Sequence, residues 1–319
     1  MEPLTLSQLE DAARLVHSVI APTPQYAWPL LGKRIGAEVW VKHENHTPIG
    51  AFKVRGGIVL LGALTCTRPG LTGIVSATRG NHGQSLAYAA RRVGVRTVIV
   101  VPRGNSSDKN AAMRAWGAEL IEHGRDFDEA REHAAMLARR DGLEMIGPFR
   151  RELVAGVASY ALELFAGAPA LDAVYVPIGC GSGICGLISA RDALGLTSRI
   201  VGVVSERAAA YARSFAARKP IETDSADTFA DGVAVRVPVA EALEVIWRGA
   251  EKIVEVSDDE IKAAIRDLYS DTHTVAEGAG AAALAALKKD APRPGARYAV
   301  IVSGGNIDRA AYTAVLGGG

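Results

Sequence analysis

One lysine of the chain, Lys53, lies in a setting that favours covalent chemistry. It follows Phe52 and comes shortly after the turn residues Pro48 and Gly50. Burial beside apolar groups disfavours the charged form of an amine and lowers its pKa, and a neutral lysine forms Schiff bases. The alternative is a solvated lysine at the start of a helix, the ordinary state of a lysine taken alone. Lys53 therefore indicates a catalytic site only in the company of other clusters.

A glycine-rich segment follows the apolar run at 174–176 and leads into a helical pattern. It consists of Gly179, Cys180, Gly181, Ser182 and Gly183. Glycines let the backbone approach a ligand closely, and the free N–H groups and positive dipole end of the following helix attract an anion. The segment predicts a phosphate site, with a ligand-free turn as the simpler alternative.

The same segment also fits a dinucleotide-binding pattern. Gly181, Gly183 and Gly186 match G-x-G-x-x-G, and the acidic residue Glu206 follows at the end of the next predicted strand. In dinucleotide-binding α/β folds such an acidic residue binds the ribose. The loop by itself does not choose between a dinucleotide and another phosphate compound.

Two further clusters follow predicted strands. Residues 76–84 offer the hydroxyl of Thr78 and the amide of Asn81 at the start of a helical pattern, which suits a carboxylate ligand. Asn81 could equally cap the helix, and Thr78 could be an ordinary turn residue. Ser303 follows the last apolar run in the sequence Ser-Gly-Gly-Asn, which means little in isolation.

The elements that must position these clusters alternate between short β-branched runs and longer helical patterns. The predicted strands are 38–41, 73–76, 97–101, 173–176, 200–204 and 298–302, and helical patterns include 82–93, 109–116 and 126–139. Runs of this kind are buried on both faces of a sheet, and their alternation with helices is typical of parallel sheets. The sequence predicts an α/β fold.

Composition excludes several classes of partner. The 319 residues carry 36 Lys and Arg against 35 Asp and Glu, so no charge excess supports binding to nucleic acid or to an anionic membrane. No basic and apolar leader begins the chain, and no apolar run is long enough to span a bilayer. We expect a cytoplasmic protein. The three cysteines, without C-x-x-C spacing, favour neither disulfides nor a zinc site.

Taken in this order, the four clusters resemble the fold type II pyridoxal phosphate enzymes. The closest pattern is that of the threonine and serine dehydratases, together with serine racemase and phenylserine dehydratase. The family hallmarks K-x-E, S-F-K-x-R-G, S-G-N-H-x-Q, a glycine run and S-G-G-N correspond to 42–44, 51–56, 79–84, 179–183 and 303–306. Residues 231–235 and 277–283 are similar to two further family stretches. The dinucleotide interpretation explains none of these.

The resemblance implies a fold like that of the tryptophan synthase β chain. Two open, twisted, mostly parallel sheets flanked by helices would form a large domain, 1–52 with 147–319, and a small inserted domain, 53–146. The pyridoxal 5'-phosphate cofactor would lie in the cleft between them. We expect no C-terminal regulatory domain, and family members are often homodimers.

Site roles follow residue by residue from the resemblance. Lys53 would be the Schiff-base lysine, Phe52 a neighbour of the pyridine ring, and 179–183 the phosphate loop. Asn81 would hydrogen-bond the ring hydroxyl, and Ser303 would face the pyridine nitrogen. The residues implied to contact an amino-acid substrate are Thr78, Arg79, Gly80 and His82.

The implied reaction is α,β-elimination from an L-3-hydroxy amino acid, giving a 2-keto acid and ammonium. A neutral serine near the ring nitrogen keeps it less protonated than an aspartate would, which favours elimination over transamination. Two alternatives remain open at this point. One is a pyridoxal phosphate enzyme that replaces the β-substituent, and the more distant one is a dinucleotide-binding oxidoreductase.

Departures from the family pattern narrow the substrate. Arg79 stands where serine racemase has a catalytic serine, so racemisation is not expected as the main activity. A guanidinium suits a second carboxylate or an aromatic group, as in 3-hydroxyaspartate or phenylserine. A structural ion pair of Arg79 is the alternative. Glu206 alone is a poor cation ligand, and we propose no metal.

Overall fold

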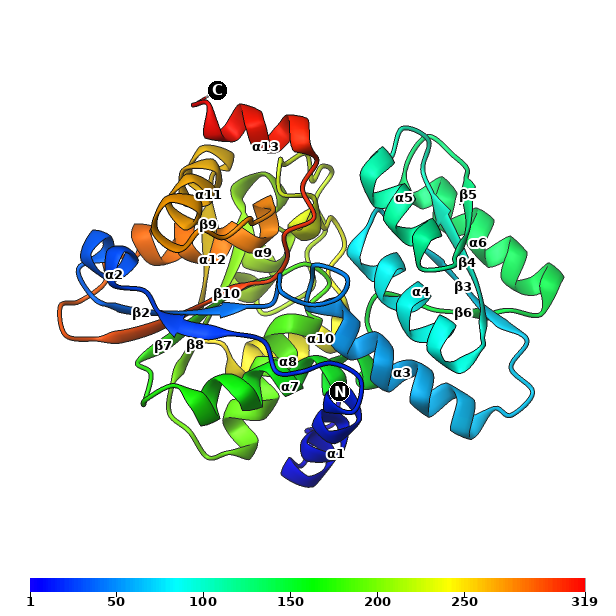
Figure 1. The fold of residues 1–319 in the computed structure, drawn as a ribbon, viewed down its shortest axis with the longest axis horizontal. Helices are drawn as coiled ribbons and strands as arrows, with labels where there is room; N and C mark the ends of the chain where they lie inside the picture. Colours follow the sequence, from blue (N-terminus) through cyan, green and yellow to red (C-terminus); the bar gives the residue numbers. More distant parts are fainter. Residues whose placement is uncertain (319) are drawn as a thin grey trace.

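The computed structural model describes residues 1–318, which form two groups of strands and helices joined through one helix (Figure 1). The larger sheet has the strand order β1-β2-β10-β7-β8-β9. Its strands are β1 (Gln25–Ala27), β2 (Glu38–His43), β7 (Ala173–Pro177), β8 (Arg199–Ser205), β9 (Lys252–Val256) and β10 (Arg297–Val302). Only β1 is antiparallel to its neighbour. The last strand of the sequence thus lies in the middle of this sheet.

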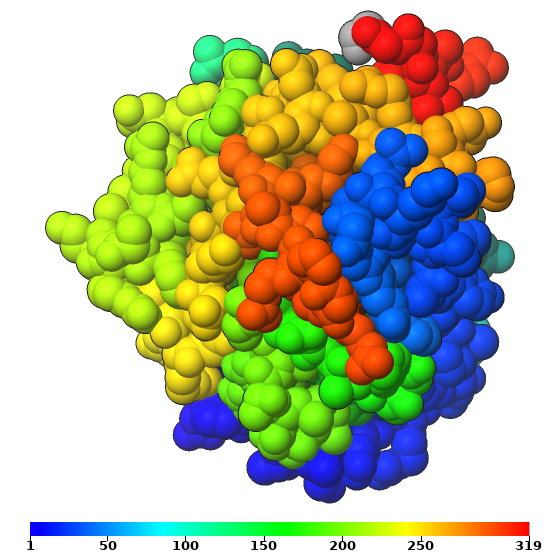
Figure 2. Space-filling view, turned by 90° about the vertical axis from the view of Figure 1, so that its left-hand side faces the viewer, coloured from blue at the N-terminus to red at the C-terminus, as the bar shows by residue number. Residues whose placement is uncertain are grey.

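Helices cover both faces of the larger sheet. One face packs against α1 (Leu6–His17), α7 (Arg151–Gly167), α8 (Ser182–Ala193) and α10 (Ala240–Gly249). The other packs against α2 (Pro29–Ile35), α11 (Asp258–Thr272) and α12 (Gly278–Lys289), with α13 (Arg309–Leu316) beside α11. Between β8 and α10 the chain forms three further helical segments, η1 (Glu206–Ala208), α9 (Ala210–Ala217) and η2 (Asp231–Val233). In Figure 2 the orange segment before β10 lies between blue N-terminal and green central segments, as the strand order requires.

The smaller sheet is entirely parallel and has the order β5-β4-β3-β6. Its strands are β3 (Gly73–Ala77), β4 (Arg96–Val101), β5 (Glu119–Glu122) and β6 (Glu144–Met145). Ile74 and Ile99 pack toward α3 (Lys53–Thr67) and α4 (Asn81–Val93), whereas Val75 and Val98 pack toward α6 (Phe127–Asp141). This alternation follows from the two-residue period of a strand. The connection from β4 to β5 carries α5 (Ser107–Ala115).

The prediction of an α/β fold with two mostly parallel sheets is confirmed. All six predicted runs are strands, and the three helical patterns correspond to α4, α5 and α6 within a few residues. The sequence analysis missed β1, β5, β6 and β9, which have at most five residues each. Only β9 among them has a fully buried residue, Val256, so the missed strands lack the continuous apolar signal of the central ones. The division into two domains stays a prediction.

Within the described part of the chain, none of the helices combines the length and apolarity needed to cross a membrane.

Candidate functional site

Lys53 is the first residue of α3, and its backbone is held from both sheets. Phe52 N–H donates to the carbonyl of Ser303 at 3.0 Å, just after β10, and Ala51 forms an isolated bridge with Gly304. From the other side, the hydroxyl of Ser85 on α4 donates to the carbonyl of Lys53 at 2.6 Å. The lysine backbone is thereby fixed where the two groups of elements meet.

The amine of Lys53 has no fixed partner. Nζ lies 5.3 Å from the centre of the Phe52 ring and makes no hydrogen bond or ion pair within residues 1–318. Burial lowers the pKa of Lys53, against the opposing influence of Cys180 and Glu277. An amine in this setting is available as a neutral nucleophile, as the sequence predicts.

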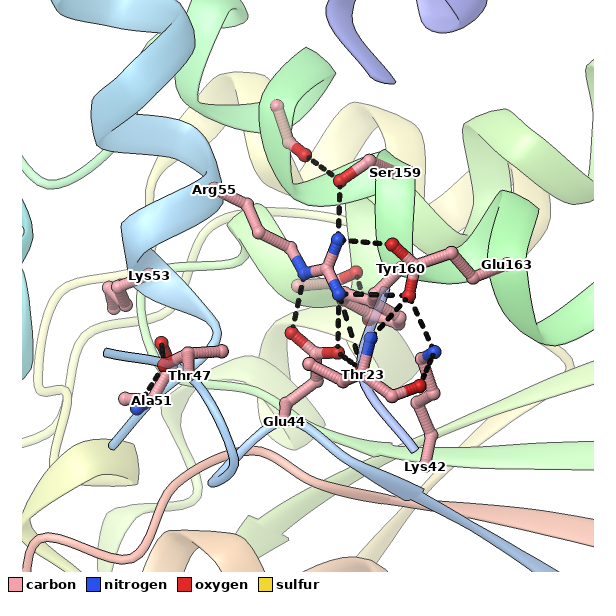
Figure 3. Close-up of polar contacts among 12 residues, drawn as sticks. Thr23, Lys42, Glu44, Thr47, Ala51, Lys53, Arg55, Ser159, Tyr160 and Glu163 are labelled. Atoms are coloured by element: carbon pink, nitrogen blue, oxygen red, sulfur yellow. Dashed lines mark hydrogen bonds and ion pairs between the residues drawn. The ribbon is translucent and has the colours of Figure 1, made fainter. Parts of the chain in front are cut away.

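A buried ion network fixes the first turn of α3 on the side opposite Lys53 (Figure 3). Arg55 is fully buried and donates to Glu44 at 2.7 Å and to Glu163 at 2.6 Å. Its further acceptors are Ser159 and Thr23. Charge-assisted bonds in which Arg donates to paired carboxylates are short and directional. Because these partners come from the turn after β2, from α7 and from the segment before β1, the start of α3 is tied to the larger sheet.

Close helix packing strengthens the same attachment. A Cβ atom at Gly156 of α7 would lie 2.3 Å from the carbonyl oxygen of Arg55, and one at Gly56 would lie 2.8 Å from the carbonyl oxygen of Leu153. No side chain fits at either position, so α3 and α7 approach with their backbones nearly in contact. Sequence analysis included Gly56 only as the last residue of the 51–56 motif, without a role, and it did not single out Gly156.

The glycine loop turns from β7 into α8. Gly181 has φ of 97°, a left-handed conformation that glycine adopts without strain. A Cβ at Gly179 would lie 2.4 Å from the carbonyl oxygen of Gly232. In residues 1–318 the backbone N–H groups of 179–183 donate to no protein acceptor. The loop therefore presents a row of free donors at a helix N-terminus, which is an anion site.

A small apolar cavity of about 10 Å³, the size of one water site, lies beside Phe52 and the start of α8. Its lining includes Phe52, Tyr160, Gly183 and Ser303. Tyr160 is fixed because its hydroxyl donates to the carbonyl of Gly183 at 3.0 Å. The remaining lining residues are Val176, Pro177 and Ile301. Three of the predicted cofactor positions thus share one cavity wall.

Asn81 begins α4 and belongs to a polar group that the sequence analysis did not identify. Its Nδ2 donates to Glu277 at 2.8 Å, and its Oδ1 accepts from Asn306 at 2.7 Å. Glu277 is buried, its second carboxylate oxygen has no partner in the described residues, and burial together with Asp231 raises its pKa to about 7. The sequence signal for Glu277 was the stretch 277–283, which was noted without a role.

The predicted substrate loop is compact and mostly buried. Thr78 is buried, and its hydroxyl accepts from the N–H of Gly80 at 3.2 Å. His82 is also buried, and burial lowers its pKa to about 3, so its ring is neutral. Arg79 is exposed and makes no ion pair in residues 1–318, so the alternative of a structural ion pair finds no support.

Cys180 lies in the glycine loop near Lys53. Burial raises the pKa of its thiol, and the charge of Lys53 lowers it by less. The thiol is therefore neutral at ordinary pH.

A family model described as pyridoxal-phosphate dependent enzyme matches residues 16–304. The chain belongs to this family. The match covers the lysine, the 78–82 loop, the glycine loop and Ser303. The cofactor of the family is pyridoxal phosphate, and the prediction of that cofactor is confirmed.

Curated relatives of this family member are named threonine dehydratases or threonine ammonia-lyase. It is 35% identical over 275 residues to the biosynthetic L-threonine dehydratase of Pasteurella multocida, covering 86% of this chain and 53% of that protein. It is 31% identical to the catabolic L-threonine dehydratase of Staphylococcus aureus N315, covering 98% and 92%. The chain spans little more than half the length of the biosynthetic relatives it matches.

Solved structures agree with the fold. The processed form of threonine deaminase isoform 2 from Solanum lycopersicum superposes with a TM-score of 0.90 at 28% identity, covering 98% of this chain and 94% of that one. Maize serine racemase gives a TM-score of 0.92 at 25% identity, covering 97% and 96%. The resemblance to fold type II enzymes of the threonine and serine dehydratase type is confirmed.

The residues present fit pyridoxal phosphate. The cofactor needs an amine for its aldehyde, donors for its phosphate and an apolar slot for its ring. In residues 1–318 the Lys53 amine makes no hydrogen bond, and the N–H groups of 179–183 have no protein acceptor. The Phe52 ring offers an apolar face 5.3 Å from the amine, and Cys180 of the loop is close enough to affect the pKa of Lys53.

Proposed function

We propose that this family member is a pyridoxal phosphate-dependent ammonia-lyase acting on an L-3-hydroxy amino acid. The observation that carries the proposal is the amine of Lys53, which makes no hydrogen bond in residues 1–318 and lies near Cys180, in a loop whose N–H groups have no protein acceptor there. The threonine dehydratases among its relatives support the same reaction.

The chain's own residues hold the cofactor. The bound ring supplies an electron sink that stabilises negative charge at the substrate Cα. The N–H groups of 179–183 would bind the phosphate, Phe52 would pack against the ring, Ser303 would face the ring nitrogen and Asn81 would donate to the ring hydroxyl. The serine cannot hold a proton on that nitrogen as a carboxylate would, which favours loss of a β-substituent over transamination.

Lys53 has two tasks in this proposal. Its amine would hold the cofactor, and the same amine, when free, would remove the proton from the substrate Cα. Its lowered pKa supports both tasks, because a neutral amine is needed for attack and for proton removal. The Ser85 and Ser303 contacts to the backbone at 52–53 keep the amine at a fixed place during these steps.

The substrate carboxylate would bind at the 78–82 loop, where α4 begins. Thr78 and the backbone there offer donors at a helix N-terminus. Arg79 is an unpaired, exposed guanidinium on the same loop and would contact a carboxylate or aromatic group on the substrate β-carbon. We therefore include 3-hydroxyaspartate and phenylserine with threonine and serine as candidates.

The deciding assay measures 2-keto acid release from threonine, serine, 3-hydroxyaspartate and phenylserine, with Arg79→Ala beside the wild type. Keto acid from at least one substrate supports the lyase. Incorporation of an added thiol without keto acid would favour the β-replacement alternative. Loss of preference for the bulkier substrates in Arg79→Ala supports the role of Arg79, and an unchanged preference contradicts it.

Assembly and location stay proposals as well. We propose a homodimer in the cytoplasm that takes a small amino acid as its only substrate partner. The family resemblance supports the dimer. Light scattering on the purified chain tests it, and a monomeric mass at micromolar concentration contradicts it.

A further inference from the structure

The amide of Asn81 has one donor hydrogen that the protein does not use. Its oxygen accepts from Asn306, and one of its two N–H groups donates to Glu277. No other acceptor for this nitrogen is recorded within residues 1–318. An amide nitrogen carries two donor hydrogens, so one remains for a ligand.

Three hydrogen bonds fix the orientation of the Asn306 and Asn81 amides. The carbonyl of Ile49 can only accept, so the nitrogen of Asn306 must face it, at 2.8 Å. The second hydrogen of the same nitrogen then points to Asn81, which must present its oxygen. The nitrogen of Asn81 is left toward Glu277, which accepts through Oε1 whether or not its other oxygen is protonated. Reversing the Asn81 amide would place two donors face to face.

The backbone around this group leaves room for these side chains. A Cβ at Gly304 would lie 2.5 Å from Oε1 of Glu277, and one at Gly50 would lie 2.8 Å from Oδ1 of Asn306. Glu277 is held in turn because its N–H donates to the carbonyl of Gly304 at 3.0 Å. Asn306 and Glu277 therefore fill space that a larger residue at 50 or 304 would occupy.

Asn81 lies on the side of α4 that faces Lys53. Ser85 lies one helical turn after Asn81, and its hydroxyl binds the Lys53 carbonyl. Residues four apart lie on one face of a helix. Glu277 is close enough to Lys53 for its charge to affect that amine.

We propose that Glu277, together with Asn306, is a positioning residue that orients the Asn81 amide so that its free N–H binds the hydroxyl oxygen on the cofactor ring. This inference rests on the proposed function, in which Lys53 carries the cofactor and Asn81 contacts the ring. It assigns Glu277 a role through Asn81 and not through contact with the cofactor.

The test measures binding to the apoprotein and needs no turnover. Apoprotein is titrated with pyridoxal phosphate and with 3-deoxypyridoxal phosphate, which lacks the ring hydroxyl. The quantity compared among variants is the Kd for the deoxy compound divided by the Kd for pyridoxal phosphate. Asn81→Ala gives the ratio without the amide. We expect Glu277→Ala to give the same ratio as Asn81→Ala, each about tenfold below the wild type, the value of one hydrogen bond of ordinary strength.

Three further variants make the result specific. The double variant Asn81→Ala with Glu277→Ala should match either single one, because Glu277 acts only through Asn81. Glu277→Gln keeps an acceptor oxygen and should retain most of the wild-type ratio. Glu10→Ala removes an exposed carboxylate on α1 and should change nothing. Melting of each apoprotein reports whether a variant is folded.

Each outcome decides the matter. If Glu277→Ala keeps the wild-type ratio, either because binding of both compounds is weakened equally or because neither changes, the positioning role is overturned. A wild type with the same ratio as Asn81→Ala would show that the free N–H does not contact the ring hydroxyl. Failure of the wild type to bind either compound at Lys53 would instead contradict the proposed function.

Discussion

Lys53 and Arg55 stand two residues apart, yet their surroundings give the two cations opposite properties. Arg55 is surrounded by carboxylates and remains charged, whereas the Lys53 amine lies over the Phe52 ring and pairs with no anion in residues 1–318. A buried charge is stable only when it is paired and hydrogen-bonded, and an unpaired amine becomes neutral instead. The contrast explains why Lys53 is suited to chemistry and Arg55 to anchoring the helix.

Replacing Lys53 tests its role directly. We expect Lys53→Ala to lower keto acid release by at least about a hundredfold, since one positioned acid–base group contributes this much or more. The fold should persist, because the side chain makes no hydrogen bond in the described residues. Turnover is compared with thermal melting on the same samples. Activity within tenfold of the wild type would remove Lys53 from the mechanism.

Glu163 should make the protein sensitive to acid. Although burial raises its pKa, Arg55 and Lys42 outweigh burial and lower the pKa of Glu163 to about 2. A carboxyl whose pKa is depressed on folding stabilises the protein at pH values above its ordinary pKa, near 4.5. This stability is lost as the pH falls toward 2. Urea unfolding between pH 6 and pH 2 measures this. The gap in stability between wild type and Glu163→Gln should shrink on acidification, and a constant gap contradicts the assignment.

Helix α3 contributes to both halves of the molecule, and its ends have different environments. Its first turn packs on α7 and contacts α4, while its later residues pack with the smaller sheet. Helix ridges normally keep axes 8–10 Å apart, and closer approach requires small residues at the crossing. The two glycines at the α3–α7 contact meet this requirement.

Gly156→Ala should therefore destabilise the protein by about 1–3 kcal/mol, the usual cost of overpacking. The added methyl group would lie 2.3 Å from the Arg55 carbonyl and would push away the turn that carries Lys53. Gly62→Ala on α3 is the matched control, because its methyl group meets only the end of Leu15 at 3.0 Å. The control should be neutral, or more stable by up to about 1 kcal/mol from helix propensity. Equal urea midpoints for the two variants would refute this account of the crossing.

At the scale of the whole molecule, the start of α5, which lies in the connection from β4 to β5, contacts residues in the group of elements around the larger sheet. Lys109 forms an ion pair with Asp231, and its side chain is only 12% exposed. Nearby, the hydroxyl of Ser106 donates to Asp308 at 2.6 Å. A pair with one buried partner is screened less than a surface pair, so it resists separation of the two groups of elements.

Lys109→Met should loosen this attachment. We expect faster amide hydrogen exchange in residues 105–123, since local opening follows the loss of contacts that hold a segment. Lys252→Met is the control, because Lys252 pairs with Asp290 at the edge of the larger sheet and is half exposed. Exchange that is unchanged in 105–123, or changed equally by the control, would exclude a holding role for Lys109.

The sequence alone determined the strands at the centres of both sheets, because continuous apolar runs are local signals. Its motifs also predicted the cofactor through their resemblance to a known family, whereas the roles of Lys53 and of the glycine loop stay predictions. It did not identify Glu277 and Asn306 as partners of Asn81, or Gly156 as the partner of Arg55. Those pairs join residues about 100 to 225 positions apart. Their meaning comes from distances across packed elements, and such distances depend on the tertiary structure and not on spacing along the chain.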